Sequence, residues 1–154
     1  MTRQKVASLL ERGAQLYNEG NYGEAETVFL DVVRLHPKEV EAYEYLGEVY
    51  MEKKEYDHAI QTLEFARSLN PNDDRIYYDL GRVYQTQHDW KKALEHFRVC
   101  VELMPNNPKN LHGLLQVSIE AGDRFRARET LRRLKQADPD NQKLVELEEQ
   151  VNTM

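Results

Sequence analysis

The 154-residue sequence has one cysteine, no long apolar run and no excess of positive charge. The single cysteine, Cys100, excludes an internal disulfide and any site that needs several thiolates. No stretch approaches the roughly 18 apolar residues of a membrane-spanning helix, so membrane insertion is not expected. The net charge of −6 argues against a general affinity for nucleic acid, and no nucleic-acid partner is expected.

Motifs for export, catalysis and metal binding are also missing. The N-terminal apolar run "VASLL" is too short for the core of a signal peptide and is followed at once by Glu11 and Arg12. A cytoplasmic location is therefore expected. The five histidines have no metal-ligand spacing, and no glycine-rich loop that could hold phosphate is present. We expect no enzyme activity, no cofactor and no metal.

What the sequence does contain is a repeat of 34 residues. Four of the five prolines follow this step, and so do four alanines and three glycines: Pro37, Pro71, Pro105 and Pro139; Ala25, Ala59, Ala93 and Ala127; Gly13, Gly47 and Gly81. Such a period indicates a stack of similar supersecondary units. The alignment predicts one domain, 1–154, with repeats at 6–39, 40–73, 74–107 and 108–141.

Each repeat is predicted to contain two helices joined by a tight turn. In the second, Tyr43, Gly47 and Tyr50 mark one helical face, and a polar turn "KKEYD" separates this helix from the next. Proline ends each unit because it cannot continue a helix, and "NNP" at 106–108 places a capping Asn before Pro108. After the last repeat, a capping helix over 142–152 is predicted from the apolar spacing of Leu144, Leu147 and Val151.

The repeats resemble tetratricopeptide repeats (TPRs) over about nine tenths of the chain. Two units carry the family pattern of aromatic, Leu-Gly, aromatic, small, bulky, small and Pro residues: Tyr43, Leu46-Gly47, Tyr50, Ala59, Leu63, Ala66 and Pro71; Tyr77, Leu80-Gly81, Tyr84, Ala93, Phe97, Cys100 and Pro105. The resemblance implies an all-α fold, a right-handed α-solenoid of helix-turn-helix repeats. It also implies a non-catalytic module that binds a peptide or partner helix in a concave groove.

In this family the first helix of each repeat lines the groove. The helical phase then predicts a set of binding residues: Tyr17, Glu41, Glu44, Tyr45, Glu48, Glu52, Arg75, Tyr78, Arg82, Lys109 and His112. The remaining six tyrosines fall at framework positions and are predicted to pack: Tyr22, Tyr43, Tyr50, Tyr56, Tyr77 and Tyr84. Cys100, at a small-residue position of the second helix, is expected to be a buried structural thiol.

The acidic side of the second repeat leaves two interpretations open. Residues 34 apart lie side by side on neighbouring helices, so Glu41 is expected to meet Arg75 and Glu48 to meet Arg82, whereas Glu44 and Glu52 have no such partner. The glutamates form either a solvated ladder of ion pairs or an acidic subsite for a ligand that contains Lys or Arg. The second, third and fourth repeats carry net charges of −5, 0 and +2, which fits a bipolar peptide.

Other partners are also considered. Family members that bind the EEVD tails of heat-shock chaperones use a two-carboxylate clamp, but the matching positions here are Leu10, Ala14, Tyr45, Arg75 and Asp79. Only Arg75 is basic, so no EEVD-type tail is expected. The basic run "DRFRARETLRRLK" is either a solvated face or a docking site for an acidic partner or nucleic acid. The alternative functions are a self-assembling scaffold (a homo-oligomer) and an accessory chaperone for secreted or pilus subunits.

Overall fold

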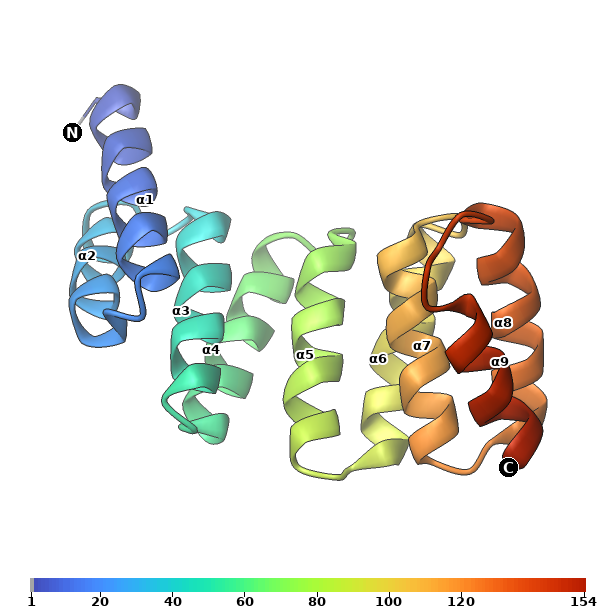
Figure 1. Ribbon diagram of the computed structural model, residues 1–154. Coiled ribbons are helices and arrows are strands. Elements are labelled where there is room, and N and C mark those ends of the chain that lie inside the picture. Colours follow the sequence, from blue (N-terminus) through green and yellow to red (C-terminus); the bar gives the residue numbers. More distant parts are fainter. Residues whose placement is uncertain (1) are drawn as a thin grey trace. The chain divides into compact units, whose positions relative to one another are not determined.

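The computed structural model describes residues 2–154, and within them it contains nine helices and no strand (Figure 1). Eight of these helices follow one another as four pairs, each joined by a short turn: α1 (Arg3–Asn18) and α2 (Tyr22–Leu35); α3 (Val40–Glu52) and α4 (Tyr56–Leu69); α5 (Asp74–Thr86) and α6 (Trp90–Leu103); α7 (Pro108–Glu120) and α8 (Arg124–Ala137). The ninth, α9 (Leu144–Thr153), follows the last pair.

The chain divides into two compact units, and each is described on its own. The first ends at Asp79, within α5, and the second runs from Leu80 to Met154. The expected single domain over 1–154, with its repeat bounds, stays a prediction.

Small residues at the helix crossings allow each pair to pack closely. In the first unit α1 packs on α2 and α3 on α4. A Cβ added to Gly47 would lie 2.6 Å from Leu63, and one added to Gly13 would lie 2.5 Å from Phe29. In the second unit a Cβ on Gly81 would lie 2.9 Å from Phe97. The bulky member of each pair is fully buried, so the recurring glycine is a steric requirement of the crossing.

Two framework tyrosines of the first unit make the same contact 34 residues apart. The hydroxyl of Tyr43 donates to the carbonyl of Pro37 at 3.1 Å, and that of Tyr77 donates to Pro71 at 2.9 Å. The ring of Tyr43 also meets Phe65 edge-on, with centroids 4.8 Å apart. These tyrosines therefore pack within the fold, as their register predicts.

The turn inside every pair contains one residue in the left-handed region. These residues are also 34 apart: Gly20 (φ 79°), Lys54 (φ 62°), His88 (φ 59°) and Gly122 (φ 72°). In the first turn the backbone N–H of Gly20 donates to Tyr17 and that of Asn21 donates to Leu16, which satisfies carbonyls at the end of α1. Two of the four turns hold this conformation without glycine.

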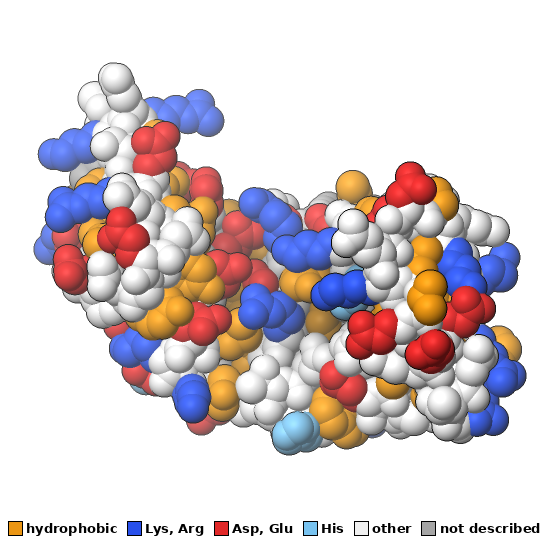
Figure 2. Space-filling model, in the orientation of Figure 1, with side chains coloured by type: hydrophobic (Ala, Val, Ile, Leu, Met, Phe, Trp, Pro, Cys, Tyr) orange, Lys and Arg blue, Asp and Glu red, His pale blue; other side chains and the backbone are white. Residues whose placement is uncertain are grey.

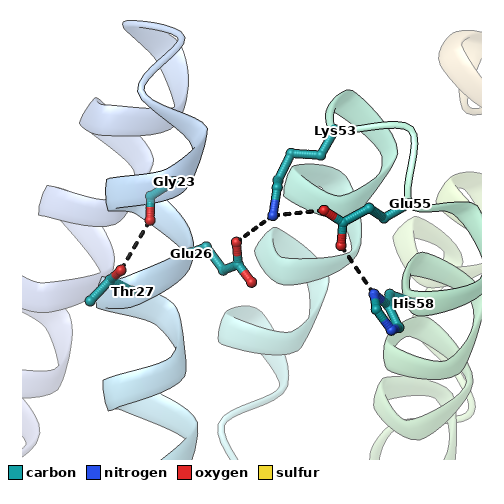
Figure 3. Close-up of polar contacts among 6 residues, drawn as sticks. All are labelled: Gly23, Glu26, Thr27, Lys53, Glu55 and His58. Atoms are coloured by element: carbon teal, nitrogen blue, oxygen red, sulfur yellow. Dashed lines mark hydrogen bonds and ion pairs between the residues drawn. The ribbon is translucent and has the colours of Figure 1, made fainter.

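A charged network joins the first and second helix pairs (Figure 3). Nζ of Lys53 lies 2.7 Å from Glu26 of α2 and 2.8 Å from Glu55, and Glu55 also contacts Nδ1 of His58 at 3.0 Å. The hydrogen bond from Lys53 to Glu26 has the largest effect on the pKa of Lys53, and with the bond to Glu55 it raises that pKa. The network ties the turn after α3 to the preceding repeat, although pairs this exposed contribute little to stability.

The second unit is closed by α9, which packs on α8 and buries Leu147 and Val151. The predicted cap of α7 is present: Oδ1 of Asn107 accepts from the backbone N–H of Lys109 at 2.9 Å and of Asn110 at 3.3 Å. Cys100 is fully buried, as expected, and its carbonyl accepts a hydrogen bond from Nδ2 of Asn110 at 3.2 Å.

Candidate functional site

The predicted binding residues are distributed over both units. The first unit contains eight of them and the second contains three: Tyr17, Glu41, Glu44, Tyr45, Glu48, Glu52, Arg75 and Tyr78; Arg82, Lys109 and His112. That all eleven act as one binding surface stays a prediction.

The most unusual of these residues is Glu44, a carboxylate buried at the edge of the hydrophobic core. It occupies the repeat position that holds Leu10 in the first helix pair, and Leu10 belongs to the core of the first unit. Glu44 is only 7% exposed and Leu10 is 8% exposed. The helical phase predicts this position at the groove, and the structure shows that the side chain is buried.

Glu44 has a cationic neighbour that the sequence did not predict. Its Oε2 lies 3.4 Å from Nη2 of Arg75. The 34-residue step does not identify this pair, and the ion pair that it predicts between Arg75 and Glu41 does not form among the described residues. The pair expected between Glu48 and Arg82 stays a prediction.

Arg75 is held mainly by Asp73, which lies just before α5. Nε and Nη2 of Arg75 donate to the two carboxylate oxygens of Asp73 at 3.0 and 2.7 Å, and the backbone N–H of Arg75 adds a third bond at 3.1 Å. These hydrogen bonds raise the pKa of Arg75 and lower the pKa of Asp73. A bidentate pair with Asp73 leaves Arg75 only partly available to Glu44.

The other oxygen of Glu44, Oε1, is buried and has no hydrogen-bond partner. Burial raises the pKa of Glu44 to about 7; nearby Arg75 lowers it, while Asp73, Glu41 and Glu48 raise it further. A carboxylate that is desolvated, surrounded by like charges and incompletely hydrogen-bonded is unstable in its ionised form. Glu44 is therefore partly protonated near neutral pH.

The remaining acidic residues of α3 surround Glu44 at the surface. Glu41 is exposed and Glu48 is half-buried, and both contribute to the raised pKa of Glu44. Figure 2 shows acidic side chains gathered over α3, next to hydrophobic ones. Glu52 is exposed at the end of α3 and is not among the charges that shift the pKa of Glu44. The acidic cluster thus consists of Glu41, Glu44 and Glu48, with Asp73 beside it.

The tyrosines predicted in the groove are half-buried and not fully exposed. The ring of Tyr45 stacks on Phe29 of α2, with centroids 4.8 Å apart and an angle of 5°. Burial and the charges of Glu41 and Glu48 raise the pKa of Tyr45. The rings of Tyr17 and Tyr22 are tilted against each other, with centroids 5.5 Å apart. Each therefore presents one part of its ring to solvent from a rigid support.

In the second unit, the three predicted residues differ in burial. Lys109 is exposed, and Arg82 and His112 are half-buried. Burial lowers the pKa of His112, and the charge of Lys143 lowers it slightly more. His112 is therefore neutral at pH 7 and able to act as a hydrogen-bonding group there.

Two residues that shape this surface were missed by the sequence analysis. Asp73 positions Arg75, and its signal was the segment "NDDR" just before a predicted helix, where an Asp is typical of a cap. Phe29 supports Tyr45 from the neighbouring helix. No sequence signal identifies that contact, because it depends on how α2 packs on α3.

Other classes of site were also sought in residues 2–154. No group of three or more His, Cys, Asp or Glu side chains in this range is placed to hold a metal ion. None of the helices in the same range is long and apolar enough to cross a membrane.

Solved structures with this fold cover most of the chain. MamA 41-end from Desulfovibrio magneticus RS-1 superposes with a TM-score of 0.77 at 28% identity, over 89% of this chain and 77% of that one. Another MamA crystal structure superposes with a TM-score of 0.77 at 16% identity, over 99% of this chain and 92% of that one. The first TPR of Spaghetti (RPAP3), bound to HSP90 peptide SRMEEVD, superposes with a TM-score of 0.72 at 21% identity. The match covers 79% of this chain and 97% of that one. These likenesses confirm the all-α solenoid fold class.

Comparison with curated proteins finds no significant match. Two sequence profiles, both described as tetratricopeptide repeat, match residues 38–106 and 84–151 and together span 38–151. The structural likenesses and the 34-residue register of the helix pairs agree with these matches. The chain belongs to the tetratricopeptide repeat family, whose members are in general protein-interaction modules.

Proposed function

We propose that the first unit binds a peptide or partner helix that carries a lysine or arginine, at a surface formed by α1, α3 and the start of α5. The observation that carries this proposal is the buried, incompletely paired carboxylate of Glu44. The family supplies the general function, a protein-interaction module. The chemistry of this surface supplies the class of ligand.

A ligand cation would supply what Glu44 lacks. Its Oε2 has only the 3.4 Å contact with Arg75, and Oε1 has no partner. The last torsion of a Glu side chain is broad, so the carboxylate can rotate to meet a ligand cation. An ammonium or guanidinium group placed between Glu41, Glu44 and Glu48 would stabilise the ionised form of Glu44. Charge-assisted hydrogen bonds of this kind are about twice as strong as neutral ones.

The aromatic side chains would supply the apolar part of the contact. Tyr45 is fixed by its stacking on Phe29, so little side-chain entropy is lost when a ligand packs against it. Tyr17 and Tyr78 are also half-buried in the same unit. Aromatic anchors of this kind commonly contribute the largest share of binding energy at protein interfaces.

We do not propose an EEVD-type tail as the ligand, although the RPAP3 neighbour was solved with such a peptide. Of the five positions that match the carboxylate clamp, Leu10 and Asp79 are buried and Tyr45 is stacked on Phe29. Arg75, the one basic member, is already bound by Asp73. An acidic tail would therefore meet the acidic cluster without a free cation.

The proposal is tested by panning a random 12-residue peptide library against the immobilised chain and sequencing the bound peptides. We expect enrichment of peptides that contain Lys or Arg, and loss of that enrichment with Glu44→Gln and with Tyr45→Ala. Glu24→Gln, which removes the same charge from the exposed side of α2, is the matched control and should behave as wild type.

The enriched peptides also allow a pH test. A ligand cation favours ionised Glu44, so its affinity should rise as the pH increases from 6 to 8 across the pKa of about 7. The proposal is wrong if no basic peptide is enriched, or if Glu44→Gln retains the same peptides with the same affinity. The self-assembling scaffold and the accessory chaperone stay predictions; light scattering at increasing concentration tests the first.

A further inference from the structure

Helix α8 has a strongly basic outer surface in an otherwise acidic chain. It contains six arginines and lysines and one glutamate, whereas the whole chain has a net charge of −6. Its buried side is formed by Ala127, Thr130, Leu131 and Leu134. The opposite side is exposed and contains Phe125, of which 81% is accessible to solvent. Nothing within the described chain covers this ring.

The cations of α8 divide into two groups. Those on its flanks are bound within the second unit: Arg126 pairs with Asp123 at 3.1 Å, Arg133 donates to the carbonyl of Pro105 at 3.0 Å, and Lys135 pairs with Glu148 of α9 at 2.7 Å. The contacts of Arg133 and Lys135 position α8 against its neighbours, and that of Arg126 lies at the start of α8 itself. Their roles are therefore explained by the fold.

The other three cations, Arg124, Arg128 and Arg132, have no ion pair with any described residue and are exposed. They follow one another at i, i+4 and i+8, so they form a row about 12 Å long. Phe125 precedes Arg128 by three residues and Arg132 by seven, on the same face of the helix. We call Arg124, Phe125, Arg128 and Arg132 the α8 basic face.

A cleft of about 240 Å³ adjoins this face on the α6 side. Its walls include Arg98 and Val101 of α6, Leu114 of α7, and Arg126, Thr130 and Arg133 of α8. Glu129 also lines the cleft and follows Phe125 by one helical turn, so the cleft and the basic face are continuous. The combined surface presents arginines, the glutamates Glu102 and Glu129, the apolar side chains of Val101 and Leu114, and an exposed aromatic ring.

We propose that the α8 basic face docks an acidic, amphipathic segment of a partner protein. Carboxylates spaced along two turns of a helix would pair with Arg124, Arg128 and Arg132, and arginine is suited to bidentate bonds with carboxylates. An apolar side chain of the same segment would cover Phe125. This inference is independent of the acidic surface on the first unit, since it concerns another helix and a ligand of opposite charge.

A protein segment fits this surface better than nucleic acid does. The exposed Phe125 gives an apolar partner a contact that a phosphate backbone does not need. Charge complementarity and an aromatic anchor together specify an acidic and partly apolar ligand.

The test uses the full chain and a library of 16-residue peptides in which Asp, Glu, Leu and Phe are over-represented. We expect wild type to enrich peptides with acidic and apolar residues at helical spacing. The double variant Arg128→Gln/Arg132→Gln and the single variant Phe125→Ser should each lower the affinity for those peptides by at least about fivefold. Because Phe125, Arg128 and Arg132 are exposed, both variants should give the same circular dichroism spectrum as wild type.

The matched control is Arg3→Gln/Arg12→Gln, which removes two exposed arginines from α1. It should retain the acidic peptides with wild-type affinity. Equal binding by wild type, by Phe125→Ser and by the α8 double variant would overturn the proposal. So would binding of a labelled 20-nucleotide single strand that is lost in the α8 double variant and kept in Phe125→Ser, since that result indicates a nucleic-acid surface.

Discussion

Glu44 of α3 and Arg75 of α5 approach within 3.4 Å, but the arginine makes its shorter bonds to Asp73. Arg75 therefore contacts two carboxylates, and the nearer one, Asp73, binds both Nε and Nη2 of the guanidinium group. The consequence is a buried glutamate with one weak ion pair and one unpaired oxygen. Such a group lowers the stability of the free protein, and burying a charge without full compensation is the physical reason.

The first prediction concerns Glu44 and pH. Its pKa is about 7 in the folded protein, above its usual value of 4.5, so the folded state holds a proton that the unfolded state releases. Stability should therefore fall as the pH rises from about 4.5 to 7 and level off above it. Glu44→Gln removes this pH-dependent loss of stability. The unfolding free energy of the variant relative to wild type should therefore be roughly 2 kcal/mol higher at pH 8 than at pH 5.

Urea unfolding of both proteins at the two pH values measures this difference. Glu52→Gln is the control, because it removes the same charge from an exposed position of the same helix. Its effect on the unfolding free energy measures what removing an exposed carboxylate from α3 does, and is subtracted at each pH. Parallel pH profiles for wild type and Glu44→Gln would show that Glu44 titrates normally.

The second prediction concerns the left-handed residue Lys54. This conformation costs a residue with a Cβ about 1–2 kcal/mol, whereas glycine adopts it freely. Gly20 and Gly122 occupy the same position in two other repeats. Lys54→Gly should therefore raise the unfolding free energy by roughly 0.5–1 kcal/mol, measured by urea denaturation.

Two control variants separate the backbone effect from the side chain. Lys54→Ala removes the side chain but keeps the Cβ, so its stability should stay near that of wild type. Gly20→Ala should destabilise by about 1 kcal/mol, because no atom lies within 4 Å of the new Cβ and only the backbone is strained. A gain from Lys54→Ala equal to that from Lys54→Gly would assign the effect to the side chain.

The third prediction concerns the helix crossing at Gly47. A Cβ there would lie 2.6 Å from Cγ and Cδ2 of Leu63, a residue that is fully buried. Since Leu63 is fully buried, it can move away only by disturbing the side chains packed around it, and Gly47→Ala should destabilise by roughly 1–3 kcal/mol. Thermal unfolding followed by circular dichroism measures the loss.

Gly23→Ala gives the comparison of opposite sign. Gly23 also lies in a helix, but a Cβ there has no neighbour within 4 Å. Alanine is the better helix former, so this variant should be more stable by up to about 1 kcal/mol. If both substitutions lowered the melting temperature equally, close packing at Gly47 would not be the cause of its loss.

Most of the repeated architecture was predictable from the sequence. The 34-residue step of Pro37, Pro71, Pro105 and Pro139 located the helix pairs, and the recurring glycines located the crossings, since both are local requirements of chain geometry. The cap at Asn107 was also predicted and is present. The left-handed turns at Lys54 and His88 were not predicted, because neither residue type indicates that conformation.

For the candidate site, the sequence correctly placed Glu44 on the first helix of its repeat but predicted the wrong partners. It paired Arg75 with Glu41 by the 34-residue step, whereas the structure pairs Arg75 with Asp73 and Glu44. The 34-residue period of the sequence identifies which helices are neighbours. It does not determine which rotamer a long side chain adopts or which carboxylate it reaches first.

The sequence by itself thus determined the helices, their order and the acidic character of α3, because periodicity and composition are properties of the chain. Only the tertiary structure decided that Glu44 is desolvated, that Tyr45 rests on Phe29 and that Phe125 remains uncovered. These features depend on burial, which is set by packing between segments distant in sequence. Burial is what turns a glutamate with a usual pKa of 4.5 into one that titrates near 7.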